Sequence, residues 1–174
     1  VLGVLACTFF CAGLTLTRRD ASLDGNALYL ARFVQMGMYI AVAVLFRNHL
    51  PSVRNLLVVG CACLLGGSVV APSVAGALEG VLPGVSLGVA VAGHVLSGAA
   101  NGLFLLMFGH FFSTYGPKTS AVAIALASLL REVIFAWGIF WPEPVVSAAW
   151  VWLRVLAAVL LVGALAAKRV CGMA

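Results

Sequence analysis

Arg131 and Glu132 are adjacent charges near the middle of an apolar run that extends from about Thr119 to Trp141. A run of this length can cross a bilayer as a helix. A charge at the membrane centre costs about 2.5–3.5 kcal/mol on insertion scales, so it normally faces a protein interior or a wet cavity and marks function. The chemistry predicted from this pair is recognition of a polar molecule inside the membrane, and the sequence does not identify that molecule.

Further polar residues fall at similar depths on other apolar runs. Two runs repeat the spacing i, i+3, i+7 that places side chains on one helix face: Arg32, Gln35 and Tyr39, and then His94, Ser97 and Asn101. At a rise of about 1.5 Å per residue, Arg154 and Glu132 both lie about 13 Å from the outer edge of their runs. We therefore predict one polar layer, composed of Arg32, Gln35, His94, Asn101, Arg131, Glu132 and Arg154.

The predicted layer holds three arginines and one carboxylate. Adjacent helical positions point about 100° apart, so Arg131 and Glu132 are not expected to face each other. Glu132 is instead predicted to pair with Arg154 on the neighbouring antiparallel run. The excess of positive charge favours an anionic ligand or lipid headgroup as the complement. Alternatively, Arg32 snorkels outward, Arg131 faces water, His94 makes an interhelical hydrogen bond, and the Glu132 pair is purely structural.

The composition excludes an ordinary soluble domain. Of 174 residues, 64% are hydrophobic and 9% are charged, and the apolar residues come in runs of about twenty. No stretch alternates apolar with polar residues over ten positions, so a β-barrel is excluded. The net charge of +5 is spread over short loops and helices, so no nucleic-acid partner is expected. The predicted fold class is all-α: a polytopic membrane protein with a bundle of six transmembrane helices.

Six spans are predicted, at about residues 1–17, 27–46, 55–74, 85–112, 119–141 and 145–167. They form a single domain over residues 1–174. The fourth run is long, so it either tilts or ends before Gly109. Pro83, Pro117 and Pro142 mark the connections that follow the third, fourth and fifth spans. The first residue already lies inside an apolar run, so the chain is expected to be a fragment or half of a larger unit.

Orientation follows from the distribution of Lys and Arg over the short loops. Five basic residues lie on one side, against Arg18 and Arg19 on the other. This predicts a multi-pass protein of the plasma membrane with both termini in the cytoplasm. The four tryptophans cluster toward the outer interface, where amphipathic rings favour the headgroup level.

Small residues predict close packing between spans. Gly84 and Gly88, and then Gly98 and Gly102, are spaced four apart, and Gly93 and Ser97 add a third pair. Lipid tails are as apolar as leucine, so helices in a membrane associate through such close approach. Packing within the chain is favoured over dimerisation.

No pattern of residues predicts catalysis or a resident cofactor. The three histidines are dispersed, H-E-x-x-H is absent, and His94 and Ser97 lack the surroundings of a serine nucleophile. The five cysteines include no C-x-x-C pair and are interpreted as small apolar residues. The chain is therefore predicted to be neither an enzyme nor a metalloprotein, and no cofactor is expected.

The arrangement resembles one half of a major facilitator superfamily transporter, in which six-span halves have both termini in the cytoplasm. The basic loop at residues 47–54 and the turn at residues 115–119 occupy the expected places, although the loop lacks the family's Gly and Asp. The composition is also similar to the facilitator-like membrane halves of LuxR-type regulators. These resemblances imply a transporter-like half with a site for a small anionic molecule, paired with a second half or copy. The alternatives are a ligand-sensing domain without transport, or the substrate-binding subunit of a multi-component importer.

Overall fold

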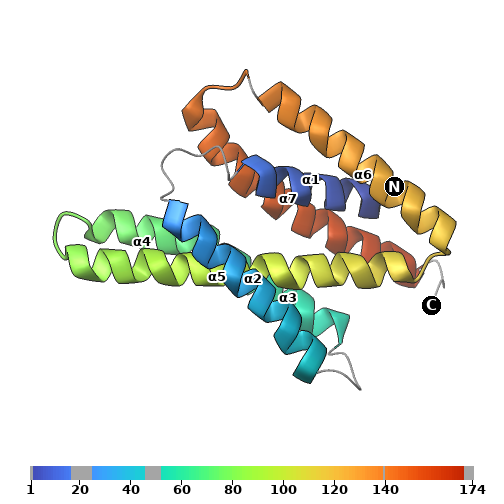
Figure 1. Ribbon diagram of the computed structural model, residues 1–174, viewed down its shortest axis with the longest axis horizontal. Coiled ribbons are helices and arrows are strands. Elements are labelled where there is room, and N and C mark those ends of the chain that lie inside the picture. The colour runs from blue at the N-terminus through green and yellow to red at the C-terminus, as the bar shows by residue number, and fades with distance from the viewer. Residues whose placement is uncertain (1, 17–24, 46–51, 139, 171–174) are drawn as a thin grey trace. The chain divides into compact units, whose positions relative to one another are not determined.

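The computed structural model describes residues 2–16, 25–45, 52–138 and 140–170. All regular structure in these ranges is helical (Figure 1). The elements are α1 (Leu2–Leu16), α2 (Gly25–Leu45), α3 (Val53–Leu65), the π-helix η2 (Gly66–Val70), α4 (Ala71–Leu78), α5 (Pro83–Ser113), α6 (Pro117–Gly138) and α7 (Glu143–Val170). The all-α prediction is confirmed for the described residues.

The helical segments coincide with the six predicted apolar runs. α3, η2 and α4 follow one another without a break and together form the third segment. Three of the described helix starts have a local cause: the Ser52 side chain accepts a hydrogen bond from the Asn55 amide at the start of α3, and Pro83 and Pro117 open α5 and α6. The predicted loops at residues 18–26 and 47–54 lie largely outside the described residues.

Two of the segments are long and apolar enough to cross a membrane: Arg54–Leu78 and Pro83–Ser113. The fourth segment does not end before Gly109, because α5 continues without interruption to Ser113. At about 1.5 Å per residue, its 31 residues extend about 46 Å, which exceeds the hydrocarbon thickness of a bilayer.

The turns at both ends of α5 are held by serine side chains. Between α4 and α5, the Ser86 hydroxyl donates a hydrogen bond of 2.8 Å to the carbonyl oxygen of Ala75. Between α5 and α6, the Ser120 hydroxyl donates one of 2.6 Å to the carbonyl oxygen of Phe112. These bonds satisfy carbonyl oxygens of the preceding helix, and they hold the turns before and after α5.

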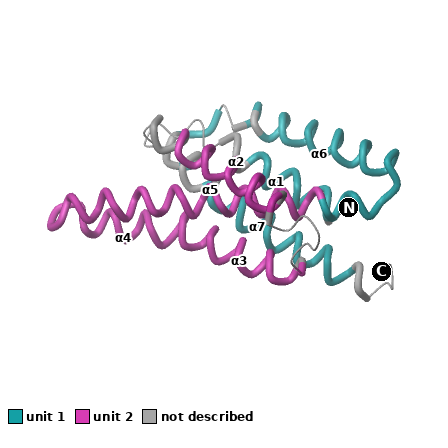
Figure 2. Tube along the Cα trace, turned by 60° about the horizontal axis from the view of Figure 1, so that its bottom comes forward, with its two compact units in different colours: residues 1–22, 110–174 teal, residues 23–109 magenta. Residues whose placement is uncertain are grey.

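The chain divides into two compact units, which are coloured separately in Figure 2. Unit 2 comprises residues 23–109 and contains α2, the α3–η2–α4 segment and most of α5. Unit 1 comprises residues 1–22 and 110–174 and contains α1, α6 and α7.

In unit 2, α5 approaches α2 through glycine. A Cβ atom on Gly98 would lie 2.4 Å from the carbonyl oxygen of Ala31, and one on Gly102 would lie 2.9 Å from the Cβ atom of Met38. The later glycine of α5 meets the later residue of α2, so α2 and α5 run parallel. The predicted packing role of this glycine pair within the chain is confirmed.

The α3–η2–α4 segment packs against α5 in the opposite direction. A Cβ atom on Gly67 would lie 2.6 Å from the carbonyl oxygen of Gly93, and one on Gly60 would lie 3.5 Å from the ring of Phe104. By contrast, a Cβ atom on Gly84 or Gly88 would meet no described atom within 4 Å. The packing prediction is therefore wrong for this pair, because Ser86 faces α4, and Gly84 and Gly88, each two positions away from it, point to the opposite side of α5.

In unit 1, α1 packs against both α6 and α7. The side chains of Ala6, Thr8 and Phe10 are almost fully buried, and the Thr8 hydroxyl donates a hydrogen bond of 2.9 Å to the carbonyl oxygen of Val4. The α7 side of this core contributes small and aliphatic residues such as Ala157 and Leu161.

Large apolar side chains are exposed along most of the helical segments. On α2, five of them recur at helical spacing and form a continuous stripe: Tyr29, Phe33, Met36, Ile40 and Val44. Similar side chains are exposed on the α3–η2–α4 segment, α5, α6 and α7, among them Val58, Leu87, Val122, Trp137 and Trp152. A water-soluble protein rarely exposes contiguous apolar surface of this extent.

Candidate functional site

The seven residues of the predicted polar layer are divided between the two units. Unit 2 holds Arg32, Gln35, His94 and Asn101, and unit 1 holds Arg131, Glu132 and Arg154. The two groups therefore belong to separate packing units.

Gln35 is the buried polar centre of α2, with 7% of its surface exposed. Its side-chain amide nitrogen donates a hydrogen bond of 2.9 Å to the hydroxyl of Tyr39, one turn along the helix. This contact confirms the shared face that the spacing predicted. The amide oxygen of Gln35 is buried without a hydrogen-bond partner among the described residues. It is therefore an acceptor in an apolar setting that could receive a donor from a ligand.

Arg32 lies on the same face of α2, one turn before Gln35, and its side chain is half-buried. The face therefore combines a guanidinium, an amide oxygen and a phenol hydroxyl within about two helical turns. This set can bind an anionic group through the guanidinium and a hydrogen-bond donor through the amide oxygen.

The polar residues of α5 lie on the part of the helix that packs against α2 and η2. Asn101 and Ser97 are buried, whereas His94 is half-buried. The backbone amide of Ser97 lies close to Gly67 of η2, and Gly102, next to Asn101, lies against the backbone of Gln35. The predicted unit 2 residues therefore do belong to neighbouring parts of α2 and α5.

Ser68 adds a buried hydroxyl that the spacing argument missed. It is 6% exposed, lies in the π-helix η2, and its oxygen has no hydrogen-bond partner among the described residues. Proline four residues later is the sequence signal for this feature: the ring of Pro72 would clash with the Ser68 carbonyl in a regular α-helix, and the wider π-turn relieves that clash. π-Turns inside α-helices are frequent at functional sites.

In unit 1, Glu132 forms its ion pair with Arg131, the adjacent residue. The prediction that these two side chains do not meet is wrong. Adjacent Cβ atoms do point about 100° apart, but the long arginine side chain bends back to the carboxylate. The two side chains are 35% and 57% exposed, so the pair lies on the surface of unit 1.

Arg154 is the largest fully buried side chain among the described residues, with 1% exposure. The predicted ion pair between Glu132 and Arg154 is therefore wrong: similar depth along two neighbouring helices did not bring an exposed carboxylate and a buried guanidinium together. Depth is a coordinate along the helix axis, and the pairing also depends on the rotation of each helix about that axis.

No group of three His, Cys, Asp or Glu side chains that could hold a metal ion occurs in the described part of the chain. The four cysteines that the structure describes take part in no disulfide. Comparison with protein-family models, with curated proteins and with solved structures yields no match.

Proposed function

We propose that this chain is an integral membrane protein that crosses the bilayer six times and acts as a transporter-like half, with a polar site for a small anionic molecule. The observation that carries the proposal is the distribution of polarity. Valine, leucine and aromatic side chains are exposed along most of the helical segments, while Gln35, Ser68 and Arg154 are buried. Lipid favours this distribution and water opposes it.

The directions of the helices support six crossings. Successive spans must alternate in direction, so the second and fourth spans run the same way and the third runs against them. In unit 2, α2 and α5 are parallel, and the α3–η2–α4 segment is antiparallel to α5. In unit 1, the beginning of α1 lies beside the beginning of α6, as parallel first and fifth spans require.

One face of α6 supports the expectation of a second half or a second copy. Ala121, Ala125, Ser128 and Glu132 fall on one helical face, and all four are exposed. Small residues at this spacing let two helices approach closely in a membrane. A half-exposed ion pair at the middle of an apolar helix requires protein or water beside it. We infer that another six-helix unit covers this face.

The site that we propose for the ligand is the polar face of α2 with the adjoining part of α5. Arg32 supplies positive charge for an anionic group, and the amide oxygen of Gln35 accepts a hydrogen bond from the same molecule. The ligand class is therefore a small anion that also carries a hydroxyl or ammonium donor. A small anion of this kind is the ligand expected for a transporter-like half, in line with the resemblance to one half of a major facilitator superfamily transporter.

Ligand-dependent thermal shifts of the purified protein test this site, with lactate, aspartate and sulfate as probes. We expect a hydroxy or amino acid to raise Tm more than sulfate, because sulfate carries no hydrogen-bond donor at neutral pH and cannot donate to Gln35. Gln35→Leu and Arg32→Gln should each abolish the shift, while Arg54→Gln, an exposed basic residue at the start of α3, should leave it intact. A shift that survives both site variants would contradict the proposed site.

Uptake of the same radiolabelled probe into proteoliposomes then separates transport from sensing. Uptake that depends on Gln35 supports a transporter-like half. Binding that depends on Gln35 without uptake would instead support the ligand-sensing membrane domain.

A further inference from the structure

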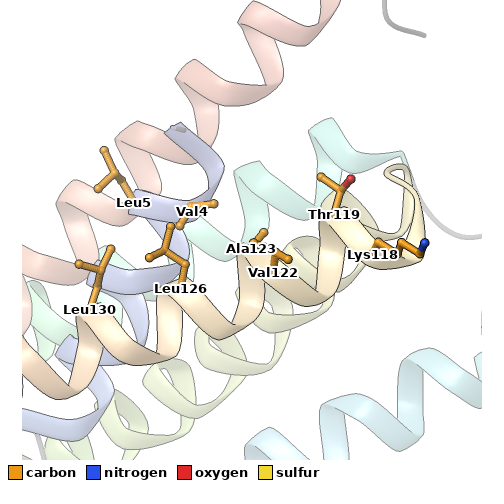
Figure 3. A pocket seen from close by; sticks show the side chains of 8 residues that line it. All are labelled: Val4, Leu5, Lys118, Thr119, Val122, Ala123, Leu126 and Leu130. Atoms are coloured by element: carbon orange, nitrogen blue, oxygen red, sulfur yellow. The ribbon is translucent and has the colours of Figure 1, made fainter.

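An apolar groove runs along unit 1 between α1 and α6 (Figure 3). Its volume is about 520 Å³. α1 contributes Val4 and Leu5. The other lining residues come from α6: Lys118, Thr119, Val122, Ala123, Leu126 and Leu130. Val122 and Leu126 are exposed, so the groove opens to the surface of unit 1 along its length.

The groove is polar at one end only. Figure 3 shows the Lys118 amine and the Thr119 hydroxyl at the beginning of α6, and Leu130 at the opposite end. Lys118 is the one charged residue of the lining. The end with Lys118 also carries the positive end of the α6 dipole, because the helix begins at Pro117. The groove therefore matches an amphiphile that has one anionic end and one apolar tail.

The length of the groove matches one leaflet of a bilayer. From Thr119 to Leu130, α6 rises about 17 Å, at about 1.5 Å per residue. Half of the hydrocarbon thickness is about 15 Å. A lipid chain whose headgroup lies at Lys118 would therefore end close to Leu130.

The distribution of charge in the lining favours a lipid over a transmembrane helix as the occupant. Seven of the eight lining side chains are uncharged, and the charged one, Lys118, lies at one end, where a phospholipid carries its headgroup. A single acyl chain is much thinner than a helix and fits the space between α1 and α6.

We propose that the groove between α1 and α6 binds one acyl chain of an anionic phospholipid, with the headgroup held by Lys118 and the beginning of α6. The proposal rests on the membrane location proposed above, and it goes beyond that function because it assigns a lipid site outside the polar residues. The Lys and Arg bias places Lys118 at the cytoplasmic leaflet, where anionic lipids are concentrated.

The test uses the full chain in vesicles that contain phosphatidylglycerol or phosphatidylcholine with a photoreactive group at the end of one acyl chain. Labelled peptides are identified by mass spectrometry. We expect phosphatidylglycerol to label the far end of the groove, at Leu126 and Leu130, more strongly than the exposed faces of α2 and α5. Lys118→Gln should weaken this preferential labelling about fivefold, as expected for the loss of one cationic contact near the membrane surface.

Two phenylalanine variants on α6 form the matched control. Ala123→Phe fills the groove and should reduce its labelling by both lipids, whereas Ile124→Phe adds the same ring at an exposed position outside the groove and should leave the labelling unchanged. Equal labelling of the groove and the exposed faces, labelling that Ala123→Phe does not reduce, or cross-links between two copies through the groove would overturn the lipid site. Absence of acyl-chain labelling on every helix would instead overturn the membrane location itself.

Discussion

At the scale of single residues, close approach of helices depends on the absence of one methyl group. The spacing of the glycines predicts that they pack, but only the structure distinguishes the pair that meets α2 from the pair that meets nothing. Gly98 lies against the backbone of Ala31, which cannot move aside as the end of a flexible side chain could.

Gly98→Ala should destabilise the protein by about 1–3 kcal/mol, because the added Cβ would lie 2.4 Å from the carbonyl oxygen of Ala31 and force α2 and α5 apart. Thermal unfolding of the purified protein in a single detergent measures this change. Gly88→Ala is the matched control on the same helix: its Cβ meets no described atom within 4 Å, and alanine favours a helix over glycine by about 0.5–1 kcal/mol. Equal stability of the two variants would mean that the α2–α5 contact is not tight.

Two buried serines should respond to alanine substitution with opposite signs. Ser68→Ala should raise stability by about 1 kcal/mol, because it removes a buried hydroxyl that has no hydrogen-bond partner among the described residues. Ser86→Ala should lower it by about 0.5–1.5 kcal/mol, because the 2.8 Å hydrogen bond to Ala75 is lost. The same unfolding measurement compares them. A stability loss in Ser68→Ala would indicate that this hydroxyl already has a partner.

At the scale of elements, the charges Arg131 and Glu132 distinguish α6 from α5. α5 is uncharged from Pro83 to Ser113, whereas α6 carries Arg131 and Glu132 past its midpoint. A helix with such charges enters the membrane readily only beside protein or water that can accommodate them.

Replacing both charges should strongly favour insertion of α6. In a translocon insertion assay of this segment, Arg131→Leu with Glu132→Leu should lower the apparent insertion free energy by up to about 2.5–3.5 kcal/mol for each charge removed. Lys118→Leu should change it much less, because Lys118 lies at the end of the helix and reaches the interface. If the Lys118 variant gave the larger effect, Arg131 and Glu132 would not lie at membrane depth.

At the scale of the whole molecule, the order of the turns along the chain predicts the side of the membrane on which each turn can be labelled. The α4–α5, α5–α6 and α6–α7 turns join four helical segments. If each segment crosses the membrane, successive turns must lie on opposite sides of it. The Lys and Arg bias predicts that the α5–α6 turn lies on the cytoplasmic side.

Cysteine accessibility tests this topology in cells. In a background without the five native cysteines, Thr114→Cys should react with a membrane-impermeant maleimide only after the cytoplasmic side is opened, and Glu79→Cys should react from outside. Ser52→Cys, at the start of α3, is the control for the cytoplasmic side. Labelling of Glu79→Cys and Thr114→Cys from the same side would mean that α5 does not cross the membrane.

The sequence by itself determined the helical class and the position of each helical segment, because run length, proline and turn residues act locally along the chain. It also identified the polar face of Arg32, Gln35 and Tyr39, since helical periodicity relates residues of the same helix. The tertiary structure decided which polar groups meet. Glu132 pairs with Arg131 instead of Arg154, Ser68 is buried in a π-turn, and Gly98 and Gly102 face α2 whereas Gly84 and Gly88 meet no described atom within 4 Å. These outcomes depend on the rotation of each helix about its axis and on its distance from its neighbours, which no local spacing specifies.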